Sequence, residues 1–160
     1  MSARVRVVSF VSLFFIALAM YPYINHLLAM PGKLGMSEQE YFIAQQSNVA
    51  WPYSGTLVFL AFVSTIILSI QARENSRVFR FALGAVFCIG ISLVVFFMFA
   101  WPASQVTNDW TVASPYWEIL RIQWEYSQAF NALLYIFAEI LIVFSLISWH
   151  VKEEFHRHAV

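Results

Sequence analysis

The sequence predicts an all-α integral membrane protein, a single domain over residues 1–160 folded as an antiparallel four-helix bundle with both termini in the cytoplasm. Composition is the first observation, because 61% of the residues are hydrophobic and 11% are charged. A typical soluble domain is about 45–50% apolar and about 25% charged. So few polar residues cannot cover a water-soluble globule, and most of the surface is therefore expected to face a lipid bilayer.

Four long apolar runs are the second observation. They cover Val7–Met30, Tyr53–Ile70, Phe81–Trp101 and Tyr126–Trp149. Each has the length of about 17–25 residues with which a helix crosses a hydrocarbon core about 30 Å thick. Polar residues before the last run extend its helix, so the spans are expected at about 7–30, 53–70, 81–101 and 120–149. The outer loops then cover 31–52 and 102–119.

The distribution of basic residues is the third observation. One side of the predicted bundle carries seven of them, namely Arg4, Arg6, Arg73, Arg77, Arg80, Lys152 and Arg157. The other side carries Lys33 and Arg121. Because cytoplasmic segments are enriched in Lys and Arg, the termini and the turn 71–80 are expected in the cytoplasm, with the bundle in the cell inner membrane. The formal net charge is zero, so nothing indicates a nucleic-acid partner.

The connecting segments carry local signals. In the first outer loop, Ser37 and Glu40 have the spacing of a capping box, which predicts a short helix over about Glu38–Ser47. In the third span, the small residues Gly84, Cys88 and Ser92 recur every four positions and predict a close contact with another helix.

Aromatic residues gather toward the predicted outer side. Five of the six tryptophans fall there, at positions 51, 101, 110, 117 and 124. One interpretation is a belt at the lipid headgroups, although a belt should decorate both interfaces. The other is an aromatic-walled mouth or partner-binding surface that faces outward.

A polar stripe runs along the last span. It consists of Glu118, Arg121, Glu125, Gln128, Ala132, Tyr135 and Glu139, with Asn131 beside it. Spacings of three and four residues place these positions on one face of a helix. We expect this face to point into the bundle. Arg121 can neutralise Glu118 and Glu125 by pairing at helical spacing.

Glu139 lies near the predicted bilayer midplane, with no Lys or Arg expected at its depth. An ionised carboxylate there is costly, so the sequence predicts a neutral, hydrogen-bonded glutamic acid. It serves either as interhelical glue or as a group that handles protons or contacts a ligand.

A second polar group lies near the outer end of the first span, where Pro22 is expected to kink the helix. Asn25 and His26 fall at the depth of Glu125 and Gln128. Together they could orient a substrate or hold a metal. The sequence has no HExxH zinc pair, no paired Glu-x-x-His motifs and no nucleotide-binding glycine pattern, so no metal site is assigned.

The segments HLLAMPGKL, EYFIAQQ and RIQWEYSQA resemble the bacterial branch of the anthrone oxygenase-like proteins, small four-span membrane proteins. For the fungal branch, this resemblance implies oxidation of a polycyclic aromatic substrate without a well-defined cofactor. His26, Arg121, Trp124 and Glu125 match the family pattern. The chain departs from it at Gln128, where histidine is usual, and at Ala29, where glutamate is frequent.

Three functions follow as hypotheses. The first is a membrane protein that binds a lipophilic aromatic molecule at its outer mouth and, if catalytic, oxidises it. His26 or Glu125 would then be the proton acceptor, and Arg121, Trp124, Gln128, Asn25 and Glu139 would contact the substrate. The second is a non-catalytic accessory subunit of a larger membrane complex. The third is a small lipophile or proton carrier that uses Glu139.

Overall fold

Helices make up nearly all of the structure, which is a computed structural model. It describes residues 3–47 and 51–158, with side chains over 4–47 and 53–148, and contains no strand in these ranges. The elements in chain order are α1 (Ala3–Lys33), α2 (Glu38–Gln46), α3 (Trp51–Gln71), α4 (Ser76–Val95), the π-helical segment η1 (Phe96–Ala100), α5 (Trp101–Val106) and α6 (Trp117–His158). The all-α prediction is therefore confirmed, as is the short helix in the first outer loop.

Four of the described helical stretches are long and apolar enough to cross a membrane. They cover Arg4–Lys33, Tyr53–Gln71, Ser76–Val106 and Trp117–Ser148. Their outward-facing side chains are mostly large and apolar, such as Phe14, Phe59, Phe87 and Phe137, each more than half exposed. A surface of this kind is stable against lipid tails and unstable in water. The chain thus has the form of a multi-pass membrane protein.

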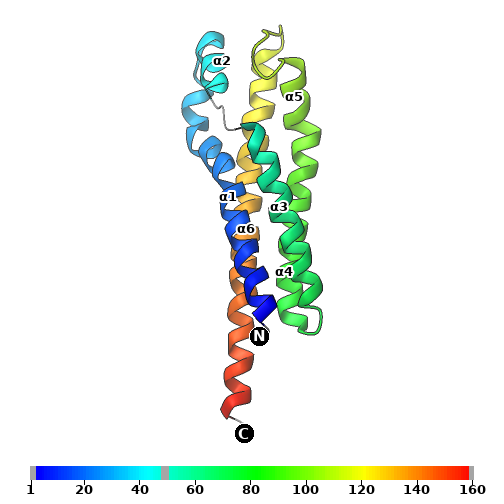
Figure 1. The fold of residues 1–160 in the computed structure, drawn as a ribbon. Helices are drawn as coiled ribbons and strands as arrows, with labels where there is room; N and C mark the ends of the chain where they lie inside the picture. The colour runs from blue at the N-terminus through cyan, green and yellow to red at the C-terminus, as the bar shows by residue number, and fades with distance from the viewer. Residues whose placement is uncertain (1–2, 48–50, 159–160) are drawn as a thin grey trace.

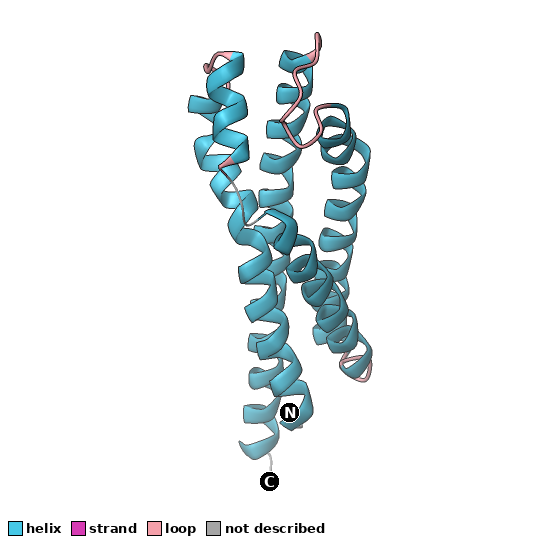
Figure 2. Ribbon diagram, turned by 45° about the horizontal axis from the view of Figure 1, so that its top comes forward, coloured by secondary structure: helices cyan, strands magenta, loops and turns pink. Residues whose placement is uncertain are grey.

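The long helices pack around a shared core. Helix α6 contacts α1 and α4, and α3 also packs against α1 and α4. The N-terminus and the C-terminus lie at one end of the molecule, whereas α2 and α5 lie at the other (Figure 1). Figure 2 shows the loop between α5 and α6 at that same end, away from both termini. This end, called the α2 end below, holds most of the buried polar groups.

Helix α1 continues through both Pro22 and Pro31. A proline inside a helix removes one backbone hydrogen bond and crowds the carbonyl four residues earlier, but it need not end the helix. The loop between α1 and α2 therefore begins after Lys33, three residues later than the sequence indicates. As a result, Lys33 belongs to the last turn of α1 rather than to a loop.

The third membrane-length stretch also runs further than expected. It continues from α4 through η1 into α5 and ends at Val106 instead of Trp101. The widened turn of η1 directly precedes Pro102, which has no N–H and would clash with the carbonyl of Met98 in a regular α-helix. A π-helical turn adds a residue to the helix at this point and so accommodates the proline.

Small side chains let α4 and α6 approach closely. A methyl group added at Gly84 would lie 3.2 Å from Leu141 Cδ1 on α6. Ala82, Ala85 and Ser92 on α4 are buried along the same contact. The predicted close contact of the Gly84 face is therefore observed, and packing of this kind associates helices in lipid.

Candidate functional site

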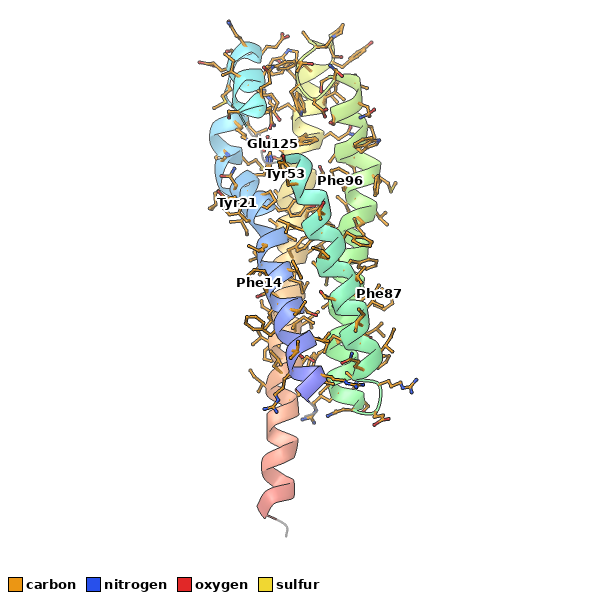
Figure 3. All side chains as sticks on the ribbon, in the orientation of Figure 1. Phe14, Tyr21, Tyr53, Phe87, Phe96 and Glu125 are labelled. Atoms are coloured by element: carbon orange, nitrogen blue, oxygen red, sulfur yellow. The ribbon has the colours of Figure 1, made fainter. Side chains whose placement is uncertain are left out.

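A buried carboxylate on α6 organises the α2 end of the molecule. Glu125 has no exposed surface, and its Oε1 accepts hydrogen bonds from Tyr41 Oη at 2.9 Å, Gln45 Nε2 at 2.9 Å and Lys33 Nζ at 3.3 Å. His26 Nδ1 lies 3.2 Å from its Oε2. Figure 3 shows Glu125 among the helices at this end, whereas Phe14, Tyr21 and Phe87 project outward. We call these five residues, Glu125, His26, Lys33, Tyr41 and Gln45, the carboxylate cluster.

Helical spacing explains how three elements reach the same carboxylate. On α1, His26 and Lys33 are seven residues apart, which is two turns on one face. On α2, Tyr41 and Gln45 are four residues apart, and Gln45 Nε2 also donates to Tyr41 Oη. The connection after Lys33 is only four residues long. It therefore returns α2 directly over the end of α1 and toward α6.

Arg121, one turn before Glu125 on α6, holds this connection in place. Its Nη1 donates to the carbonyl oxygen of Met36 at 2.6 Å and to that of Lys33 at 3.5 Å. The carbonyls at a helix C-terminus lack partners inside the helix, and positive charge there is stabilising. The guanidinium also lies 4.6 Å from the ring centroid of Trp117, a cation–π arrangement.

The expected pairing of Arg121 with Glu118 and Glu125 does not appear in the structure. The hydrogen bonds found for Arg121 go to backbone carbonyls, and Glu118 is exposed. The cation paired with Glu125 is Lys33. The sequence placed Lys33 in a loop, where its approach to the last span could not be foreseen. The extension of α1 is therefore the physical reason for the difference.

One nitrogen of His26 faces both a donor and an acceptor. Nδ1 lies 3.1 Å from Lys33 Nζ and 3.2 Å from Glu125 Oε2. A protonated Nδ1 donates to the carboxylate, whereas an unprotonated Nδ1 accepts from the ammonium group. The two arrangements differ by the position of one proton. The geometry of His26, Lys33 and Glu125 therefore accommodates either arrangement with little movement of heavy atoms.

Tyr41 contributes a neutral hydroxyl to the cluster. Its side chain is fully buried on α2, and burial together with the adjacent Glu125 carboxylate raises the pKa of the phenol. Both causes disfavour the phenolate. Tyr41 therefore remains a hydrogen-bond donor to Glu125 throughout the physiological pH range.

A small aromatic core covers the cluster. Trp110 and Trp124 are each 3% exposed and pack edge-on at 5.8 Å between ring centroids. Trp124 also packs against His26 at 6.0 Å, and Trp110 against Tyr41 at 4.9 Å. These two tryptophans belong to neither a headgroup belt nor an open mouth. They exclude water from the ionic groups. The side chain of Trp51, another of the predicted outer tryptophans, lies outside the described part of the structure.

A left-handed turn places Trp110 in this core. Asn108, Asp109 and Trp110 have φ values of 46°, 55° and 64°. Left-handed backbone costs roughly 1–2 kcal/mol per residue for L-amino acids. The turn is held by a hydrogen bond from Asp109 N to Ser104 O at 2.8 Å and by one from Trp110 N to Thr107 Oγ1 at 3.1 Å. The Ser104 hydroxyl also donates to the Asp109 carboxylate.

An aromatic cleft lies beside the cluster, between α1, α3 and the stretch from α4 to α5. Its volume is about 440 Å³, and its apolar walls include Tyr23, Val58, Leu93, Phe96, Phe97 and Trp101. Ser54, Ser104 and Asp109 add polar groups. Pockets for small molecules have volumes of about 300–1,000 Å³ and combine apolar walls with a few polar groups. This cleft has both properties.

The cleft and the carboxylate cluster share structural elements. Asp109 lines the cleft, and the next residue, Trp110, packs on Tyr41 of the cluster. On the other side, Tyr23 lines the cleft and stacks on Tyr135 of α6 at 5.0 Å between ring centroids. Glu125 itself does not line the cleft. Any chemistry between the two sites therefore requires a connection through α6.

The remaining predicted site residues fall in different surroundings. Gln128 is fully buried on the same face of α6 as Glu125, and neither polar atom of its amide has a hydrogen-bond partner among the described residues. Glu139 is half-buried, and its buried Oε2 has no hydrogen-bond partner in the same part of the chain. Its expected hydrogen bond therefore stays a prediction. Asn25 is exposed, whereas His26 beside it is buried, so the predicted grouping of Asn25 with the buried cluster is wrong.

Three residues of the cluster were not predicted as site residues. They are Lys33, Tyr41 and Gln45. Lys33 follows His26 by seven residues, which places both side chains on one face of a continuous helix. The prediction that the helix ends at Pro31 concealed this relation. The signal for Tyr41 and Gln45 was their common face on the predicted short helix, but nothing in the sequence indicated where that face points.

The cluster does not have the ligand set of a metal site. Over the residues whose side chains are described, no group of three or more His, Cys, Asp or Glu side chains gathers in one place. Beside His26 and Glu125, the third position is taken by the Lys33 ammonium group. An ammonium group has no lone pair with which to bind a metal ion, and its charge repels one.

Comparisons with protein-family models, with curated proteins and with solved structures give no match.

Proposed function

We propose that the chain is a four-span protein of the cell inner membrane that binds a lipophilic aromatic small molecule near its outer side. The spans form an antiparallel bundle with both termini in the cytoplasm, and the α2 end faces outward. The basic residues support this orientation, because Lys33 and Arg121 lie at the α2 end and the other seven fall in the segments assigned to the cytoplasm.

The aromatic cleft carries the proposal. Its volume of about 440 Å³ is large enough for a molecule of two or three fused rings, within the range of known ligand pockets. Phe96, Phe97 and Trp101 offer ring faces and edges for stacking. The hydroxyls of Ser54 and Ser104 can bond a hydroxyl or carbonyl group on the ligand.

The reaction that this site would support is oxidation of the bound aromatic molecule, as the resemblance to the anthrone oxygenase-like proteins implies. Within the carboxylate cluster, Glu125 and His26 would accept the proton that the ligand loses. Lys33 places positive charge beside Glu125, which favours its ionised form, the form that can accept a proton. The amide of Gln128 is the group in this chain at the position where the family usually has histidine.

Binding is tested by titrating the purified protein, in a mild detergent, with a three-ring phenol and following tryptophan fluorescence. Gly55 lines the cleft and has open space at its Cβ position. We expect Gly55→Leu to fill the cleft and to weaken binding at least tenfold. Gly32→Leu is the matched control, because Gly32 also has open space but lies outside the cleft. Equal affinities in both variants would refute the proposed site.

Turnover is tested separately with the same phenol and dissolved oxygen. Glu125→Gln should abolish oxidation and leave binding in the cleft intact. A second candidate function, that of an accessory subunit, is favoured by the exposed aromatic residues near the α2 end, such as Tyr53, Trp101 and Tyr116. Stoichiometric copurification of another membrane chain, with no binding of the phenol, would select this alternative.

A further inference from the structure

Two amide side chains of α6 are buried without partners in the protein. Gln128 and Asn131 have no exposed surface. Among the described residues, no hydrogen-bond partner is found for the amide nitrogen or the amide oxygen of either side chain. These four atoms stand out from the carboxylate cluster one turn away, where Glu125 accepts bonds from several donors. Two neighbouring amides left in this way are unusual, because buried polar groups are almost always hydrogen-bonded.

Water is the partner that fits these amides. Each amide needs both donors and acceptors, and a lipid tail offers neither. Bulk solvent and lipid headgroups are excluded by the complete burial of both side chains. A buried water molecule makes about three hydrogen bonds, occupies little volume, and is the usual partner of otherwise unsatisfied polar groups inside proteins.

The two amides lie on α6 between the carboxylate cluster and Tyr135. Glu125, Gln128, Asn131 and Tyr135 follow one another at spacings of three, three and four residues along α6, which corresponds to roughly 15 Å at 1.5 Å per residue. Tyr135 stacks on Tyr23 of α1. None of the four α6 residues is among those that line the cleft, so the two amides belong to the interior of the bundle beside the cluster.

We propose that Gln128 and Asn131 hold internal water molecules beside the carboxylate cluster, on the part of α6 between Glu125 and Tyr135. These water molecules give each amide the hydrogen-bond donor and acceptor that the described residues do not provide.

The internal water is tested by solution NMR of the full-length protein in detergent micelles, with ¹⁵N-labelled Gln and Asn side chains. Gln128→Leu and Asn131→Leu assign the two amide signals by their loss. We expect cross-peaks between water and both NH₂ groups, as for the exposed Gln39, which is the positive control. Absence of these cross-peaks, together with a higher melting temperature of Asn131→Leu, would show a dry interior and overturn the proposal.

Discussion

Glu125 is a buried charge whose compensation comes from two other helices. Its carboxylate accepts a hydrogen bond from Lys33 of α1, and bonds from Tyr41 and Gln45 of α2. Removing a charge from water costs several kcal/mol, and a buried ion pair recovers this only with good geometry and additional hydrogen bonds. The cluster supplies both. Each of its members therefore depends on the others, and the loss of one leaves an uncompensated group.

The ion pair gives a prediction at this scale. Lys33→Met should destabilise the protein by about 3–5 kcal/mol, because it leaves Glu125 buried without its paired cation. The double variant Lys33→Met/Glu125→Gln should recover most of this loss, since it removes both charges. Chemical unfolding in mixed micelles, followed by circular dichroism, measures the difference. Equal loss in the single and double variants would contradict the pair.

Tyr41 gives a prediction about alkaline pH. Because its pKa is raised, the folded and unfolded states both keep the phenolic proton below the ordinary value of about 10. Above that value the unfolded state loses the proton first, so the contribution of Tyr41 to stability falls as the pH rises toward the raised pKa. Tyr41→Phe should therefore lose less stability than the wild type as the pH rises. Melting temperatures of both proteins, measured as a function of pH above about 9, test this. If both melting temperatures fall equally with pH, the prediction is wrong.

At the scale of elements, α2 and the left-handed turn close the α2 end over the membrane-length helices. Helix α2 brings Tyr41 and Gln45 to Glu125, and the turn at 108–110 brings Trp110 onto Tyr41. Neither element belongs to a membrane-length helix. Their positions rest on a few specific contacts, such as those of Arg121 with the backbone between α1 and α2.

The start of α2 gives a prediction about acidic pH. Hydrogen bonds from the hydroxyl and the backbone N–H of Ser37 lower the pKa of Glu40. The stability from this contact is present above the ordinary pKa of about 4.3 and is lost as the pH falls through the lowered pKa. Glu40→Gln should make the hydrogen exchange of α2 amides faster at neutral pH and less dependent on acid. Exchange that is unchanged by the substitution would contradict the contact. Gln39→Glu is a suitable control on the exposed side of the same helix.

At the scale of the whole molecule, two chemical regions share one set of helices. The lipid-facing surface is apolar along the four membrane-length helices, and the interior near the α2 end is polar and ionic. Such an interior is stable only where every charge has a partner, because lipid offers none. The cleft lies between these regions, with aromatic walls and a few polar groups.

Orientation gives the prediction at this scale. In a Cys88→Ala background, Gln39→Cys should react with a membrane-impermeant maleimide in intact spheroplasts. Glu74→Cys should react only after lysis. Both positions are exposed, so access depends on the side of the membrane alone. The reverse pattern would place the termini outside and contradict the assignment from basic residues.

Much of the fold could be read from the sequence, because hydrophobic length is a local property. The four membrane-length helices and the helix at Glu38–Gln46 follow from runs of apolar residues and a capping signal. The same holds for the inward face of α6, where Glu125 and Gln128 are buried as the stripe predicts. Helix ends could not be read in this way. Helix α1 continues through Pro31, and the π-helical turn before Pro102 lets the third membrane-length stretch continue to Val106.

The sequence by itself thus determined the class of protein and the candidate residues His26, Arg121 and Glu125, since composition and periodicity do not depend on distant contacts. Only the tertiary structure decided which groups meet. It joined Lys33 and Tyr41 to Glu125, left Asn25 exposed, and assigned Arg121 to backbone carbonyls. The physical reason is that a short loop sets the direction of α2 and a left-handed turn sets the position of Trp110. Unlike a helix face, neither of these produces a periodic pattern in the sequence.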